Sequence, residues 1–178
     1  METKTIALEE MFNEFATANM ITEATKFGAA PTGSYDMRIT KYEGKERDGR
    51  KKAHIQAAIS AEGRKRGVVF FDISWVEGRT SSGKLDRESR LWGQLVQALF
   101  PDKAATALAD MPVGEVLDLA TKYQLRVFVT EAFKVPDATK NSGYAYITPR
   151  SEQELKDLRS KGYNSQNFVQ SISKAPNA

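Results

Sequence analysis

The stretch Gly67-Val-Val-Phe-Phe-Asp-Ile-Ser-Trp75 decides the fold, because its side chains alternate between two faces. One face is wholly apolar and carries Val69, Phe71, Ile73 and Trp75. The other face is half polar and carries Val68, Phe70, Asp72 and Ser74. Since successive side chains of a strand point to opposite faces, we expect a strand with one face on a core and the other in water.

Two earlier stretches alternate in the same way. They are residues 34–43 and residues 54–61, and the charged, glycine-containing loop 44–52 separates them. Residues 62–67 then form a hairpin-type connection into the central strand. The simplest interpretation is a meander of three antiparallel strands.

After the meander the sequence is first helical and then returns to the period of a strand. Residues 84–100 have an apolar stripe at helical spacing, and residues 102–119 predict a broken helix. Residues 124–133 and 144–148 alternate again. This order predicts a mostly β fold with flanking helices, organised as a five-stranded OB-like barrel with a helix between strands 3 and 4.

The segments on both sides of the barrel predict helices. Apolar residues between positions 8 and 16 repeat at helical spacing, so we expect an amphipathic helix that ends near Lys26. Ser151-Glu-Gln-Glu154 is a capping box that starts another helix, and the polar tail from residue 164 is expected to fray. The predicted divisions are residues 1–30 (N-terminal amphipathic helix and linker), 31–150 (OB-like barrel domain) and 151–178 (C-terminal helix and frayed tail).

The composition is that of an ordinary globular protein, with 178 residues, 40% hydrophobic and 28% charged residues and a net charge of +3. The absence of cysteine excludes a disulfide framework and thiolate chemistry. Acids interrupt the N-terminus where a signal peptide needs apolar residues, and no apolar run approaches the ~20 residues of a membrane span. We expect a cytoplasmic protein with no cofactor and no membrane partner.

The outward positions of the predicted strands combine arginine, amide and aromatic side chains without a matching set of acids. On the strands, the predicted nucleic-acid-binding residues are Arg38, Tyr42, Gln56, Phe70, Arg126 and Phe128. The loops add Arg50, Lys51, Lys52, Arg64, Lys65 and Arg66. Cationic groups neutralise phosphates and aromatic rings stack on bases, so this set predicts a site for single-stranded nucleic acid. Its affinity should depend strongly on salt and weakly on sequence.

Other interpretations of these residues stay open. The run Arg64-Lys65-Arg66 also fits a solvated turn, and Phe70 could be covered by the N-terminal helix or by a dimer partner. Tyr144 and Tyr146 share one face of the last strand, but the pattern does not decide which. Two arginines on the polar face of the helix after the meander, Arg87 and Arg90, are left out of the predicted site.

Catalysis has little support in the sequence. The only histidine is His54, which excludes a site built on several histidines and an ordinary serine triad. The acids that metal-dependent nuclease chemistry would need lie on different elements, at Asp36, Asp72, Glu77, Asp86 and Glu88. We therefore expect a non-catalytic protein and place a nuclease third among the alternatives.

The layout also resembles a known family. Gly33-Ser34-Tyr35 opens the first strand, and a helix Leu91-Trp-Gly-Gln-Leu-Val-Gln-Ala-Leu99 precedes a strand that begins Leu125-Arg-Val-Phe-Val. Over residues 33–150 this order resembles the small OB-fold single-stranded-DNA-binding proteins encoded in bacteriophage replication and recombination modules. The resemblance implies binding and protection of exposed single strands during phage replication or recombination, in the host cytoplasm.

We therefore predict a single-stranded-DNA-binding protein, with DNA favoured over RNA and a homo-oligomer allowed. The rival prediction is a protein-interaction module that uses the same barrel and the N-terminal helix to bind a host or self partner. Salt separates the two, because phosphate-driven binding weakens steeply with ionic strength and an apolar protein interface hardly responds.

Overall fold

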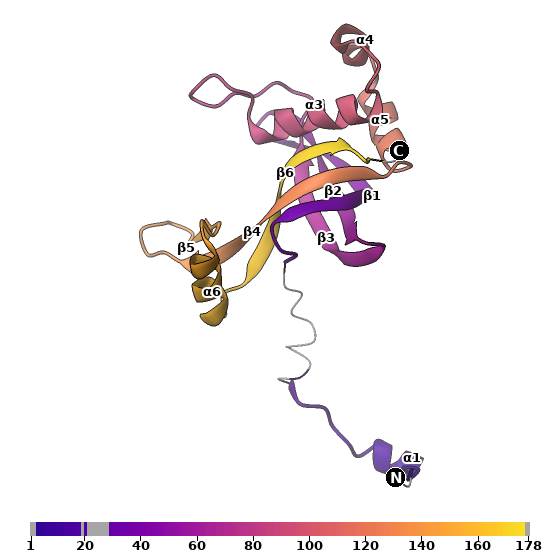
Figure 1. The fold of residues 1–178 in the computed structure, drawn as a ribbon, viewed down its shortest axis with the longest axis vertical. Coiled ribbons are helices and arrows are strands. Elements are labelled where there is room, and N and C mark those ends of the chain that lie inside the picture. Colours follow the sequence, from indigo (N-terminus) through magenta and orange to yellow (C-terminus); the bar gives the residue numbers. More distant parts are fainter. Residues whose placement is uncertain (1–2, 19, 21–28, 177–178) are drawn as a thin grey trace.

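The computed structural model describes residues 3–18, 20 and 29–176 of the chain, and its main body is a curved antiparallel sheet with helices at its ends (Figure 1). The strands are β1 (Gly33–Arg47), β2 (Arg50–Ala61), β3 (Arg64–Ile73), β4 (Leu125–Pro136), β5 (Tyr144–Ile147) and β6 (Ser165–Lys174). The helices are α1 (Leu8–Met11), α3 (Arg87–Leu99), α4 (Ala105–Ala109), α5 (Val113–Ala120) and α6 (Glu152–Ser160). The predicted mostly β fold with flanking helices, including helices between the third and fourth strands, is confirmed.

The six-stranded sheet is open. Its strand order is β3-β2-β1-β4-β5, and β6 pairs with β4 beside that path. β3 and β6 contact each other, but no ladder of hydrogen bonds joins them in the described residues. The sheet therefore curls toward closure and stops at a gap between β3 and β6, where a closed barrel would have a further ladder.

One half of this gap is covered by α3, which packs on both strands. The Ser74 amide after β3 donates to the Glu88 carbonyl, at 3.1 Å. On the other side, the Ile172 amide of β6 donates to Gln94 Oε1, at 2.9 Å. The apolar stripe of α3 enters the core, where Leu91 and Leu95 are fully buried. The helix thus holds the two outer strands at a fixed separation.

Both hairpins of the meander end in tight turns rather than in loops. Arg47 pairs with Arg50 across Asp48-Gly49, and Ala61 pairs with Arg64 across Glu62-Gly63. All four turn residues have positive φ, the geometry of a type I′ turn that suits the twist of a hairpin. The predicted charged loop 44–52 is therefore wrong, and its charged residues belong to the ends of β1 and β2.

The prediction of a frayed helical tail is also wrong, because residues 165–174 form β6. Val169 and Ile172 are both buried, and their spacing of three residues fits a helix better than a regular strand. A bulge reconciles this spacing with a strand, because Val129 pairs with Val169 while the preceding Phe128 pairs with Ser171. The extra residue, Gln170, lets both apolar side chains face the core.

The predicted amphipathic helix near the N-terminus is reduced to α1 in the described residues. Its stripe is exposed, with Phe12 at 78% and Phe15 at 89% of full exposure. No side chain caps its first turn, and an isolated helix of this length is marginal in water. The predicted end near Lys26 lies outside the described residues. No helix in the part that the structure describes is long and apolar enough to span a membrane.

Candidate nucleic-acid interface

Phe70 is the most exposed large hydrophobic side chain on the outer face of β1–β3, at 57% of full exposure. It lies opposite Gln56 in the ladder, and its ring is stacked on the ring of His54 with centroids 6.0 Å apart. His54 is held in turn by Asp72, with 2.7 Å between Nδ1 and Oδ1. The local structure therefore presents a supported aromatic ring with one face toward solvent.

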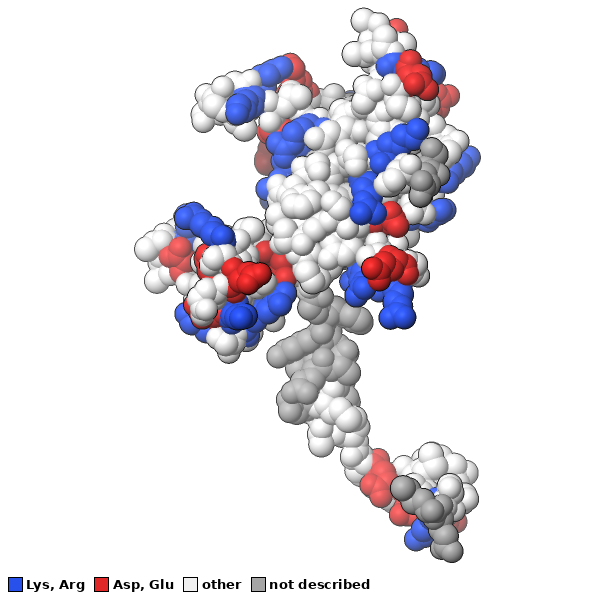
Figure 2. Space-filling view, viewed as in Figure 1, with Lys and Arg blue, Asp and Glu red and all other residues white. Residues whose placement is uncertain are grey.

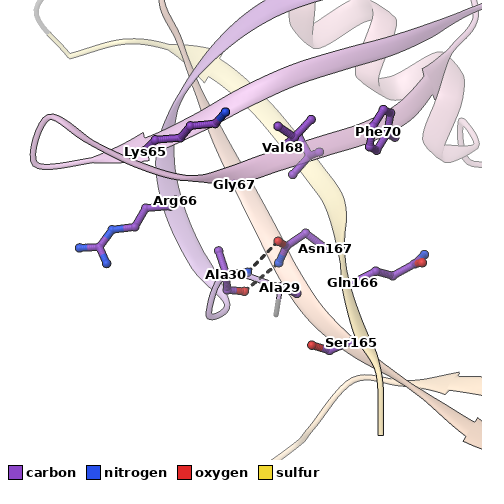
Figure 3. A pocket seen from close by; sticks show the side chains of 11 residues that line it. Ala29, Ala30, Lys65, Arg66, Gly67, Val68, Phe70, Ser165, Gln166 and Asn167 are labelled. Atoms are coloured by element: carbon purple, nitrogen blue, oxygen red, sulfur yellow. Dashed lines mark hydrogen bonds between the residues drawn. The ribbon is translucent and has the colours of Figure 1, made fainter. Parts of the chain in front are cut away.

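Three cations follow the turn between β2 and β3 and belong to the start of β3. Arg64, Lys65 and Arg66 are exposed and form no ion pair with any described residue. A bulge makes Arg66 the extra residue between the pairs Ser60–Lys65 and Ile59–Gly67. Bulges re-aim side chains, and Figure 3 shows Lys65 and Arg66 pointing in different directions from the strand. In Figure 2 basic side chains stand at this end of the hairpin, at the lower edge of the domain.

A cavity of about 450 Å³ lies in the uncovered half of the gap between β3 and β6. β3 lines it with residues 65–70, and β6 lines it with residues 165–167 (Figure 3). The backbone of Ala30 closes one side through two hydrogen bonds with the Asn167 amide, at 2.8 and 2.9 Å. The basic residues and Phe70 therefore border a concave surface, and Phe70 belongs to its wall.

The other basic segment is Arg50-Lys51-Lys52 at the start of β2, and two of its three side chains are paired with groups of the protein itself. The Arg50 guanidinium donates to Asp86 at 2.7 Å, to Ser89 Oγ at 2.6 Å and to the Val76 carbonyl at 2.8 Å. Lys52 is buried and lies 3.0 Å from Glu88. Only Lys51, between them, is exposed without an ion pair among the described residues.

Two carboxylates near these cations, Asp86 and Asp72, have depressed pKa values. The hydrogen bond from Arg50 holds the pKa of Asp86 below its usual value, and this effect outweighs partial burial. For Asp72, burial would raise the pKa, but hydrogen bonds from His54 and Lys45 outweigh it and lower the pKa. Both carboxylates are therefore held ionised beside cations, and these cations stay paired within the protein.

Tyr42 was predicted on the outer face and lies on the inner one. A bulge between Ile39 and Lys41 shifts the register, so that Tyr42 pairs with the buried Ile55. Such a shift by one residue moves the following side chains to the opposite face. Its ring packs on the core and its hydroxyl donates to Asp118 of α5, a hydrogen bond that raises the pKa of Tyr42.

The remaining predicted residues divide between two regions of the sheet. Arg38 is exposed on β1 opposite Ala58, and no described residue pairs with its charge. Arg126, on β4, is bound to Asp36 at 3.0 Å. Phe128 lies farther along β4 opposite Ser34, with 39% of its surface exposed. The structure thus brings Arg38, Gln56, Phe70 and the run Arg64–Arg66 onto neighbouring strands, with Phe128 away from them.

Two residues that sequence reasoning left out lie beside Phe70. A second cavity of about 290 Å³ is lined by His54 and Phe70 on one side and by Arg87 and Phe168 on the other. The Arg87 guanidinium carbon lies 5.6 Å from the centroid of the Phe168 ring. The strand period of β6 could have placed Phe168 outward, but the bulge at Gln170 conceals that period.

The carboxylates considered for nuclease chemistry are all paired with cations. Asp36 binds Arg126, Glu77 binds Arg79, and Asp72, Asp86 and Glu88 join the network around Arg50 and Lys52. Within residues 3–18, 20 and 29–176, no group of three or more His, Asp or Glu side chains is arranged to hold a metal ion.

Comparison with known proteins adds nothing to these observations. The chain matches no protein-family model, no curated protein and no solved structure. The functional argument therefore rests on the geometry of the outer face and the gap.

Proposed function

We propose that this protein binds single-stranded nucleic acid, with DNA favoured over RNA, on the outer face of β1–β3. The observation that carries the proposal is Phe70, an exposed and supported aromatic ring on the same strand as three cations that form no ion pair with the described residues. Stacking of a base on such a ring contributes roughly 1–3 kcal/mol, and free cations near it attract the phosphates.

The proposed contacts are fewer than those expected from the sequence. Phosphates meet Arg64, Lys65, Arg66 and Arg38, while a base stacks on Phe70 and Gln56 offers hydrogen bonds. Lys51 is left out, because it lies at the other end of β2 and alternation places it on the face of Ala53 and Ile55. Arg50, Lys52 and Tyr42 are left out, because their polar groups are engaged within the fold. Arg126 is engaged with Asp36 in the free protein, and Phe128 lies apart, so both are secondary.

The proposed fold for this activity is a partly open OB-like barrel. The sheet curls until β3 and β6 meet, and α3 covers one end, which supports this description. In OB folds, partial opening and a groove across the early strands suit the binding of extended polymers. As its biological role we propose protection of exposed strands in replication or recombination, in the cytoplasm and, for a phage-encoded protein, in that of the host.

The test is fluorescence anisotropy with a labelled oligo-dT at two salt concentrations. The variant Arg64→Ala/Lys65→Ala/Arg66→Ala should lose about tenfold or more in affinity at low salt. The slope of log affinity against log salt should fall by about 2, since each single-strand phosphate contact adds about 0.7.

The matched control is Lys84→Ala/Lys103→Ala/Lys122→Ala, which removes the same charge from exposed positions remote from the β2–β3 turn. It should bind nearly as the wild type does. If the wild type does not bind at low salt, the nucleic-acid proposal is wrong. If both triple variants lose affinity equally, the binding is a general charge effect and not a site.

The rival function, a protein-interaction module, is favoured by a separate observation. The segment around α1 exposes Leu8, Phe12 and Phe15, which resemble the anchors of a partner-binding segment. The affinity of a partner bound through these apolar side chains would hardly depend on salt. Measurement at two salt concentrations therefore distinguishes this function from nucleic-acid binding.

A further inference from the structure

Phe70 is not an isolated ring but one member of a row. Its ring stacks on the ring of His54, which lies on β2, with an angle of 9° between the two ring planes. Across the gap it shares the smaller cavity with Phe168 of β6. Phe168 meets Tyr146 of β5 with centroids 5.2 Å apart, and Tyr146 meets Tyr144 at 5.5 Å. The row therefore runs from β2 over β3, crosses the gap and continues to β5.

The rings beyond the gap meet edge to face, at angles of 83° and 84°. In each such pair the edge of one ring meets the face of the other, so part of the ring surface stays uncovered, and Tyr146 keeps 40% of its surface exposed. The exposed surface of Tyr146 is available to a flat ligand.

Cations accompany this row as well. Arg87 lies over Phe168 at 5.6 Å, and Lys134 Nζ lies 4.0 Å from the centroid of Tyr144. Neither cation forms an ion pair with a described residue. Two acids line the smaller cavity, Asp72 and Glu88, and both already have partners within the protein. Asp72 is bound to Lys45 and His54, and Glu88 is bound to Lys52 and Arg50. On the β5–β6 side of the gap, the row thus pairs two aromatic rings with cations that form no ion pair with a described residue.

We propose that the bound single strand crosses the gap between β3 and β6 and continues over Phe168 and Tyr146, with Arg87 and Lys134 as its phosphate contacts there. This inference rests on the proposed function and extends its site from one face of the meander to β5. Alternation of open rings and free cations is the pattern that binds successive nucleotides without sequence preference.

The extended site predicts a dependence on ligand length. A short oligo-dT of about 6 nucleotides is accommodated on the Arg64–Phe70 side, whereas one of about 16 nucleotides reaches both sides. The variant Arg87→Gln/Tyr146→Ala should therefore lose about tenfold in affinity for the long strand and less than about twofold for the short one. Both substituted side chains are partly or largely exposed, so folding should be retained, and thermal unfolding by circular dichroism checks this.

The matched control is Lys103→Gln/Tyr123→Ala, which removes one cation and one exposed tyrosine away from the row. Equal long-strand affinities for the two double variants would overturn the extended site while leaving the proposed function in place. Absence of binding by the wild type at low salt would overturn both. A loss confined to the long strand and to the row variant establishes the path.

Discussion

Two basic segments, Arg50-Lys51-Lys52 and Arg64-Lys65-Arg66, are alike in composition and both lie at the end of a hairpin. The first is drawn into a network with Asp86, Glu88 and Ser89, while the second has no anionic partner among the described residues. The difference teaches that a cation is available to a ligand only where the fold supplies it no acid. One segment stabilises the protein, and the other is free for binding.

The largest effect expected from this difference is on stability. The variant Arg50→Ala should lower the free energy of unfolding by about 2–3 kcal/mol, because it leaves the partly buried Asp86 without its cationic partner and removes the hydrogen bonds to Ser89 and the Val76 carbonyl. Denaturant unfolding measures this change. Arg64→Ala, the equivalent change in the free segment, should stay within about 0.5 kcal/mol of the wild type. Equal losses for the two variants would contradict the division of roles.

A smaller difference in unfolding free energy is expected between variants of two neighbours in the first segment, Lys52 and Lys51. Lys52→Met should cost about 1 kcal/mol in unfolding free energy, because it removes the partner of Glu88 while keeping the buried aliphatic chain. Lys51→Met should leave stability unchanged within about 0.5 kcal/mol, because Lys51 is exposed and forms no ion pair with a described residue. The comparison fails if Lys51→Met destabilises the protein as much as Lys52→Met does.

The smallest effect is a pH dependence at Asp72. Because the pKa of Asp72 is lowered in the folded protein, its ionised form adds stability above its ordinary pKa near 4. That contribution is lost as the pH falls through the lowered value. Asp72→Asn should therefore be less stable than the wild type at neutral pH by less than about 1 kcal/mol, and the difference should shrink as the pH falls below the ordinary pKa near 4. A difference that is constant from pH 7 to pH 3 would contradict this cause.

The parts of the fold that follow local patterns could be predicted from the sequence. Alternation located β1 to β5, and the capping box at Ser151 located α6, where the Ser151 hydroxyl accepts from the Glu154 amide. The parts that depend on a single inserted residue could not. The bulge at Gln170 concealed β6, and the bulge between Ile39 and Lys41 reversed the expected face of Tyr42.

The candidate site shows the same limit. Residue types indicated which side chains can bind a polyanion, but not which of them already have partners. Arg50 meets Asp86, 36 positions away, and no local pattern reports such a pairing. Likewise, Phe168 lies beside Phe70 only because the sheet curls until β6 meets β3, a long-range consequence of the strand order.

The gap between β3 and β6 also affects how copies of this protein avoid one another. An open sheet exposes unpaired backbone groups on its outer strands, and these groups invite intermolecular β-pairing and aggregation. Here the two outer strands, β3 and β6, face each other. The backbone N–H of Ile172 donates to the Gln94 side chain, and the side-chain amide of Asn167 forms hydrogen bonds with the backbone of Ala30. If the proposed function holds, many copies would crowd along one strand, and these amide side chains would then compete with such pairing for the backbone groups they bind.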